Sequence, residues 1–169
     1  QAALAGKIQF AVGDLLHLPF AGASVDWAWC ADVLWPVVIS DDPVRDVKEI
    51  ARVVKPGGTV SIVYWSSQNL LPGYPTLEAR LNSAFVATTP YLASVRPPLH
   101  FLRALGWLRA AGLERPVARS YVAEVQAPLS PELREAVAFC FAMLWGNLEP
   151  HVSKSDWHAY QRLCGAESE

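Results

Sequence analysis

A strand, a helix and a second strand, joined by short connections, constrain the fold of this chain most. Residues 25–30 form a run apolar enough for a strand that is buried on both faces. Residues 42–43, Asp-Pro, begin a helix with an N-cap acceptor and a proline in the first turn. Residues 56–58, Pro-Gly-Gly, end that helix, and residues 59–65 resume as a strand. This order predicts two parallel strands with a right-handed crossover.

The expected helix after Asp42 has one apolar and one charged face. Apolar side chains recur at helical spacing, and charged side chains cover the opposite face. The apolar set is Val44, Val47, Ile50, Ala51 and Val54, and the charged set is Arg45, Asp46, Lys48, Glu49 and Arg52.

The rest of the chain shows weaker but readable periodicity. Alternation of Ile8, Phe10 and Val12 predicts a strand over 7–13, and turn residues predict a loop over 15–24. Helices are expected over 76–86, 99–111 (with Leu102, Leu105 and Leu108 inward and Gly112 as cap), 130–145 and 155–163, and a strand over 116–127.

Composition excludes several classes of protein. A chain of 169 residues is one domain's worth of material, and 52% apolar residues suffice for a core. The net charge of −2 argues against nucleic-acid partners, because phosphate neutralisation needs clustered Lys and Arg. The three cysteines form no metal or disulfide pattern, which favours a reduced, cytoplasmic location. The most apolar segment, 136–145, is shorter than the ~20 residues needed to span a membrane.

Short motifs follow one another at informative spacing. They are Gly13-Asp14, Leu18-Pro19-Phe20, Val25-Asp26 and the run 51–58, Ala-Arg-Val-Val-Lys-Pro-Gly-Gly. In this order they resemble the class I S-adenosylmethionine-dependent methyltransferases of type 11, over Ile8 to Trp65 and again over 99–129. The resemblance implies an α/β fold, a Rossmann-like, doubly wound, mostly parallel sheet. It also implies methyl transfer from S-adenosylmethionine to a small molecule.

The resemblance assigns roles to six residues. Asp14 would accept a hydrogen bond from the adenine amino group, and Leu15 would supply a backbone contact beside it. The methionine end of the cofactor would lie against Cys30, Ala31 and Asp32, where open α/β sheets bind ligands. Trp35 would stand near the methyl-transfer pocket. Separately, Trp65 ends its predicted strand at the rim of the sheet, where it could line a substrate pocket.

Each assignment has a structural alternative. Asp14 could serve only its own turn, and Asp32 could only cap a helix. The Cys30 thiol is interpreted as a small core group. For Trp65, a core position and a pocket position are equally supported.

Other polar and aromatic residues are interpreted structurally. Trp27 and Trp29 share a strand face and are expected in the core, while Asp26 braces the start of the strand. Asp42 is expected to cap its helix and Asp41 to be solvated. The histidines show no metal-ligand spacing; His17 and His100 are the first to reconsider as a base. We expect no metal site and nominate no catalytic residue, because methyl transfer depends largely on positioning.

The family's glycine-rich first loop would lie before residue 1, and no convincing last strand follows Leu163. We therefore expect a fold that is incomplete at its amino end and short at its carboxyl end. The chain is then either a piece of a larger protein or a chain whose sheet is completed by a second copy or by a partner chain. The expected division is 1–129, the carboxyl-terminal part of the methyltransferase domain, and 130–169, a helical extension. The helix 130–145 is either a lid over the substrate or an ordinary packing or dimer helix.

Two other functions stay open at this point. The chain could be a non-catalytic methyltransferase-like domain that serves as an interaction module or partner subunit. Another Rossmann-like binder, such as a dehydrogenase, is less well supported, because the Leu-Pro-Phe and Lys-Pro-Gly-Gly spacing is not expected there.

Overall fold

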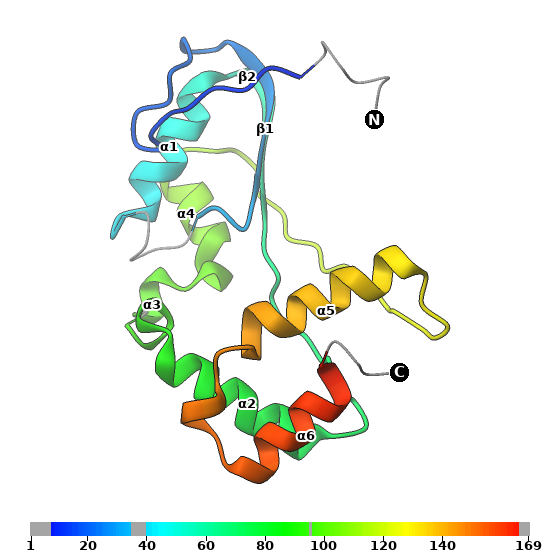
Figure 1. Cartoon of the computed structure of the whole chain (residues 1–169). Helices are drawn as coiled ribbons and strands as arrows, with labels where there is room; N and C mark the ends of the chain where they lie inside the picture. Colours follow the sequence, from blue (N-terminus) through cyan, green and yellow to red (C-terminus); the bar gives the residue numbers. More distant parts are fainter. Residues whose placement is uncertain (1–7, 35–39, 95, 166–169) are drawn as a thin grey trace. The chain divides into compact units, whose positions relative to one another are not determined.

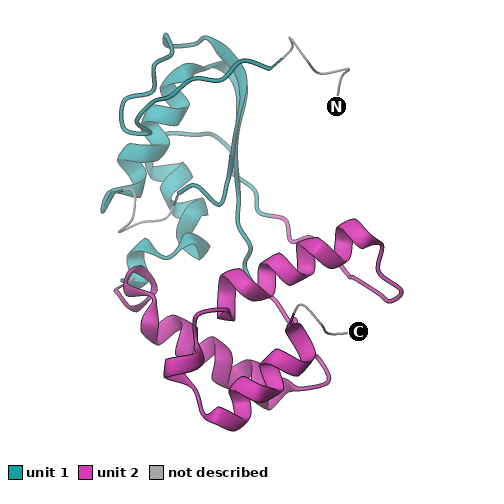
Figure 2. Ribbon diagram, in the orientation of Figure 1, with its two compact units in different colours: residues 1–66, 95–118 teal, residues 67–94, 119–169 magenta. Residues whose placement is uncertain are grey.

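The computed structural model describes residues 8–34, 40–94 and 96–165. These fall into two compact units, shown in different colours in Figure 2. Unit 1 comprises residues 1–66 with 95–118, and unit 2 comprises residues 67–94 with 119–169. The sequence-based division at residue 130 groups residues 67–94 with the sheet, whereas here they belong to the same unit as the carboxyl-terminal helices. The domain boundary stays a prediction.

Unit 1 is built on the expected strand–helix–strand unit (Figure 1). Strand β1, Val25–Ala31, is followed by helix α1, Pro43–Val53, and strand β2, Val54–Val63. The strands pair in parallel, with Cys30 opposite Ile62. The Asp42 carboxylate caps α1 by accepting from the Arg45 amide at 3.0 Å. The prediction of a parallel unit with a capped crossover helix is confirmed, and it represents part of a Rossmann-like fold.

The core of unit 1 lies on one face of this small sheet. Helix α1 and helix α4, Ala104–Ala110, contribute Val47, Ile50 and Trp107 to it, and the strands contribute Cys30 with Ala28, Val60 and Ile62. On the opposite face, Trp27 and Trp29 are 57% and 60% exposed. The predictions that β1 is buried on both faces and that these tryptophans are core residues are therefore wrong. Alternation along the strand turns them away from the face that α1 and α4 cover.

The Lys-Pro-Gly-Gly run forms a bulge inside β2 and not a loop before it. Val25 pairs with Val54 and Trp27 with Thr59, so residues 55–58 lie opposite the single residue Asp26. Lys55 donates to the Asp26 carboxylate at 2.9 Å, which confirms the expected bracing role of Asp26. The strand predicted over 59–65 therefore begins earlier and ends at Val63, before Trp65.

Two other predicted strands are wrong. Residues 8–13 and 116–127 lie in no ladder of the described structure, and Phe10, Val12 and Val122 are almost fully exposed. The alternation of apolar residues in both segments is real, but a strand exists only where a neighbour pairs its backbone groups. Among the described residues, neither segment has such a neighbour in the sheet.

The helix expected over 99–111 is broken into three pieces. These are η2, Pro97–Leu99, η3, Phe101–Arg103, and α4. The His100 ring accepts from the Leu102 amide at 3.3 Å and so starts a separate turn, which leaves Leu102 71% exposed instead of inward. Trp107 is the buried residue of α4, and Gly112 ends the helix at a φ of +91° as expected.

Unit 2 is helical and has its own core. It contains α2, Pro75–Thr88, α3, Pro90–Ala93, α5, Pro131–Trp145, η4, Glu149–His151, and α6, Lys154–Cys164. The core consists of Leu71, Leu77, Leu81, Trp145, Leu148, Trp157, Tyr160 and Cys164.

Helix α5 begins and ends as the sequence predicts. Ser130 caps it by accepting from the Leu133 amide at 3.2 Å, and α6 also matches its prediction within a residue at each end. Phe141 and Leu144 of α5 pack against the core of unit 2, which agrees with an ordinary packing role for that stripe. On the other side of the helix, Phe139 and Met143 are exposed. The lid function stays a prediction.

Gly58 allows the bulge to pass close to β1, and this generates a test. A Cβ at this position would lie 2.6 Å from the Asp26 carbonyl oxygen and 2.6 Å from Val54 Cγ1. We expect Gly58→Ala to lower the free energy of unfolding by about 1–3 kcal/mol, measured by urea denaturation.

The matched control is Gly106→Ala in α4, where nothing lies within 4 Å of an added Cβ. Alanine is the better helix former, so this variant should be neutral or more stable. Equal destabilisation by both substitutions would show that the close approach at Gly58 does not matter.

Candidate functional site

The Asp14 turn precedes the loop that leads into β1. The Asp14 carboxylate accepts from the Leu16 amide at 2.9 Å, and the Asp14 carbonyl accepts from the His17 amide at 3.0 Å. His17 Nδ1 lies 3.5 Å from Asp14 Oδ2. The Leu16 hydrogen bond is the main cause that lowers the pKa of Asp14. Asp14 therefore does stabilise its own turn, and its side chain interacts with Leu16 and His17.

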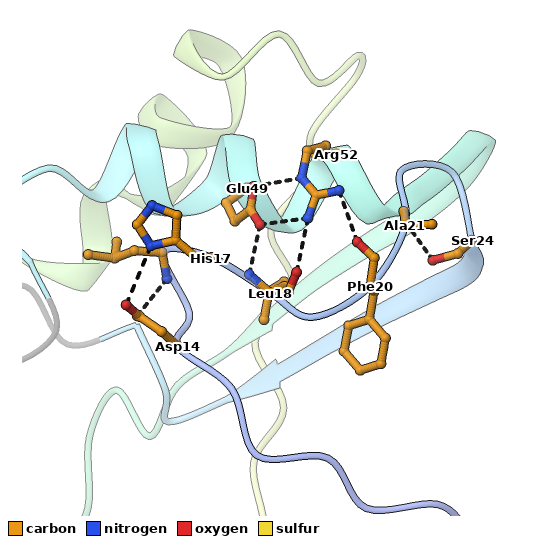
Figure 3. A network of polar contacts seen from close by, with 9 residues as sticks. Asp14, His17, Leu18, Phe20, Ala21, Ser24, Glu49 and Arg52 are labelled. Carbon is orange, nitrogen blue, oxygen red and sulfur yellow. Dashed lines mark hydrogen bonds and ion pairs between the residues drawn. The ribbon is translucent and has the colours of Figure 1, made fainter.

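A carboxylate and a guanidinium of α1 fasten this loop to the helix (Figure 3). Glu49 accepts from the Leu18 amide at 2.8 Å and from Arg52 Nε and Nη2 at 2.8 and 2.7 Å. Arg52 also donates to the carbonyl oxygens of Phe20, at 3.0 Å, and Leu18, at 3.2 Å. A guanidinium suits this task because its donors form a planar fork. The Leu-Pro-Phe motif is thus bound by the helix that directly precedes the bulge formed by the Lys-Pro-Gly-Gly motif.

The end of the same loop is held by the backbone of α1. The Ala23 amide donates to the Arg52 carbonyl at 2.9 Å, and the Ser24 amide donates to the Val53 carbonyl at 2.8 Å. Ser24 Oγ donates to the Ala21 carbonyl at 2.7 Å and closes the turn before β1. The loop is therefore attached to α1 along most of its length.

Sequence reasoning missed this anchoring network. Glu49 and Arg52 were expected only to cover the solvent side of the helix. Their spacing of three residues is a visible signal for an ion pair, but the carbonyl groups that Arg52 binds lie more than 30 positions earlier in the chain.

Asp46 also departs from its predicted place on the charged face. It is 1% exposed, and the Ser40 hydroxyl lies 2.8 and 2.7 Å from its two carboxylate oxygens. Desolvation on burial raises the pKa of Asp46. The helix therefore turns one carboxylate inward near its amino end, where the helix dipole favours negative charge.

The carboxyl end of β1 holds three more of the predicted site residues. The Cys30 side chain is buried in the core, and desolvation raises the pKa of its thiol, which supports its interpretation as a core group. Ala31 is exposed, and Asp32 adopts a φ of +49°. The Asp32 amide donates to the Val63 carbonyl at 2.9 Å, and its carboxylate accepts from the Trp65 amide at 3.4 Å. Asp32 thus joins the ends of both strands, whereas Asp42 caps α1.

The two aromatic residues that follow β2, Tyr64 and Trp65, lie in different surroundings. Trp65 is 58% exposed, which rules out a core position in the described structure. Tyr64 stacks on Phe101 with ring centroids 4.7 Å apart, and its hydroxyl donates to the Leu34 carbonyl. Trp35 lies outside the described residues. The structure therefore brings Asp32 and Trp65 together. It links Leu15 to Cys30 only through the shared core of unit 1.

Glu49 makes the anchoring network sensitive to acid. Its hydrogen bonds with Arg52 lower the pKa of Glu49 from 4.5 to about 2. A depressed pKa in the folded state stabilises the fold above pH 4.5, and the stabilisation is lost as the pH falls through about 2. We therefore expect the difference in unfolding free energy between the native chain and Glu49→Gln to shrink from pH 6 to pH 2.5.

Urea denaturation of both proteins across this range measures the difference. Lys55→Ala, which removes an exposed ion pair at the bulge, serves as a control for general charge effects. If the difference in unfolding free energy between the native chain and Glu49→Gln stayed constant with pH, the predicted contribution of the Glu49–Arg52 ion pair would be wrong.

None of the helices seen in 8–34, 40–94 and 96–165 is long and apolar enough to cross a bilayer. Within those same ranges, histidine, cysteine, aspartate and glutamate side chains form no group of three suited to a metal ion.

Comparisons with known proteins agree with the amino-terminal part of the fold. Residues 1–62 match the family described as "Methyltransferase domain". The chain is 36% identical over 75 residues to tocopherol O-methyltransferase, chloroplastic, of Arabidopsis thaliana, covering 44% of this chain and 21% of that protein. It is 34% identical over 79 residues to a probable tocopherol O-methyltransferase, chloroplastic, of Oryza sativa subsp. japonica, covering 44% and 20%.

The chain therefore spans about a fifth of the length of these curated relatives. No solved structure gives a significant match. The family match covers β1, α1 and nearly all of β2, and it includes the Asp14 turn and the anchoring network. The amino-terminal part of this chain is accordingly similar to a methyltransferase domain and to the two O-methyltransferases named above.

Proposed function

We propose that the protein containing this chain transfers a methyl group from S-adenosylmethionine to a small molecule. The observation that carries the proposal is the parallel β1–α1–β2 unit within a methyltransferase-domain match. Open α/β sheets bind ligands beyond the carboxyl ends of their strands. Ala31 and Asp32 lie at such an end, and the Asp14 turn packs against the same core through Leu15.

The residues present suit the cofactor contacts assigned to them. The Asp14 side chain is 63% exposed, and a carboxylate has lone pairs left after accepting from Leu16. It can therefore accept from an adenine amino group, with the Leu15 backbone beside it. Cys30 would contribute backbone only, since its thiol is buried, and Ala31 and Asp32 would flank the methionine end.

The chain's own residues would act by orientation. The bound cofactor supplies an electrophilic methyl group for in-line displacement by the acceptor. Effective molarity from correct placement accounts for much of the rate of such a reaction, so no particular base is required. The exposed ring of Trp65, and Trp35, would contribute to the acceptor pocket. We assign no catalytic residue.

The proposal extends to the methyl acceptor, the assembly and the compartment. The two plant relatives are named for O-methylation of tocopherol, which makes tocopherol the first acceptor to test. They are also named as chloroplastic, whereas cysteine usage in this chain favours a cytoplasmic location. A homodimer or a partner chain would complete the sheet beyond β1 and β2.

Asp14 provides the direct test of the cofactor site. We expect Asp14→Ala to weaken binding of S-adenosylhomocysteine by the intact protein about tenfold, because one charge-assisted hydrogen bond is lost. Titration calorimetry measures the affinity, and circular dichroism verifies the fold.

Asp26→Ala is the matched control, since Asp26 is an exposed carboxylate at the other end of β1. Unchanged affinity in Asp14→Ala would remove Asp14 from the site. Failure of the folded native protein to bind S-adenosylhomocysteine would favour the non-catalytic, methyltransferase-like interaction module instead.

A further inference from the structure

We propose that Glu49 and Arg52 are positioning residues for the cofactor site, holding the loop from Leu18 to Phe20 so that Asp14 and Leu15 are presented to the adenine. The proposal rests on the proposed function, because it assigns residues that act through the predicted contact of Asp14. Neither residue is expected to touch the cofactor.

Arg52 and Glu49 hold the loop by hydrogen bonds with its backbone. Arg52 donates to the carbonyl oxygens of Leu18 and Phe20, the residues on either side of Pro19, at 3.2 and 3.0 Å. Glu49 accepts from the Leu18 amide at 2.8 Å and holds the guanidinium at two points. A loop without regular structure is thus fixed by side chains from a helix in the core of unit 1.

Pro19 links the anchored residues Leu18 and Phe20 to the backbone just before Asp14. Its ring lies so close to Gly13 that a Cβ there would be 2.5 Å from Pro19 Cδ. Gly13 directly precedes Asp14, so the place of Pro19 constrains the backbone from which the Asp14 carboxylate projects. The glycine of the Gly-Asp motif is needed because no side chain fits beneath the proline ring.

His17 provides a second link between the anchor and the predicted contact. It lies 3.5 Å from Asp14 Oδ2 and one residue before the Leu18 amide that Glu49 binds. The His17 amide also donates to the Asp14 carbonyl at 3.0 Å, so the backbone next to Leu18 forms part of the Asp14 turn. Movement of Leu18 would therefore disturb the Asp14 turn directly.

A double-mutant cycle on the intact protein tests the proposal. The variants are Arg52→Lys, Asp14→Ala and the double variant that carries both substitutions. The measured quantity is the dissociation constant of S-adenosylhomocysteine. Lysine retains the charge but lacks the planar fork, so it cannot bind both carbonyls and the carboxylate at once. We expect Arg52→Lys to weaken binding about tenfold in the native background and less than twofold when Asp14 is already alanine.

Two further variants sharpen the experiment. Glu49→Gln keeps an acceptor for the Leu18 amide but loses the charge, so we expect a smaller loss of affinity with the same dependence on Asp14. Lys55→Ala removes an ion pair between exposed residues of the same strand pair and should leave the affinity unchanged. Thermal melts of each variant report any loss of folded protein separately from the affinity.

The outcomes separate this proposal from the proposed function. Binding by the native protein with a non-additive cycle supports the positioning role. Binding by the native protein with additive effects, or with no effect of Arg52→Lys, overturns the positioning role alone. Absence of binding by the folded native protein overturns the proposed function, and the positioning role with it.

Discussion

The attachment of the Leu18–Phe20 loop to α1 by Glu49 and Arg52 is the interaction on which the candidate site depends. The loop has no ladder or helix of its own, so its backbone groups need partners from elsewhere. Arg52 and Glu49 satisfy three of them and form a bidentate pair with each other. The backbone carbonyls of Arg52 and Val53 accept hydrogen bonds from the amides of Ala23 and Ser24, at the end of the loop just before β1. Contacts with α1 therefore position both the start of β1 and the Asp14 turn.

The junction between α1 and β2 supports this arrangement. Strand β2 begins directly after α1, and its first residue, Val54, pairs with Val25. The bulge over 55–58 shifts the register, and from Trp27 and Thr59 onward the two strands pair residue by residue. Gly58 makes the correction possible by approaching the backbone of Asp26. The Lys-Pro-Gly-Gly motif thus sets the register between the two strands. It places the carboxyl ends of the two strands together, where Asp32 binds the backbone of Trp65.

The features that the sequence predicted correctly depend on residues close together in the chain. The caps at Asp42 and Ser130, the crossover helix between two strands, and Gly112 at a helix end all follow from spacing over a few positions. Several of the errors concern contacts that the local pattern does not specify. Apolar alternation at 8–12 and 116–127 cannot show whether a neighbouring strand exists, and the apolar strand 25–30 cannot show that only one face is covered. The burial of Asp46 depends on Ser40, which lies outside the helical periodicity.

The amino-acid sequence by itself therefore determined the parallel β1–α1–β2 unit and the order of the motifs around it, because caps, turns and periodicity act locally. The order of the motifs also indicated the methyltransferase family, which the comparisons bear out for residues 1–62. Only the tertiary structure decided that Arg52 binds the carbonyls of a loop about 30 positions away, that Pro19 rests on Gly13, and that Trp27 and Trp29 face outward. The contacts of Arg52 and the covering of one sheet face by α1 and α4 join segments distant in the chain, and the Pro19–Gly13 contact depends on how the loop folds. Periodicity carries no information about which partner a side chain or a sheet face will meet.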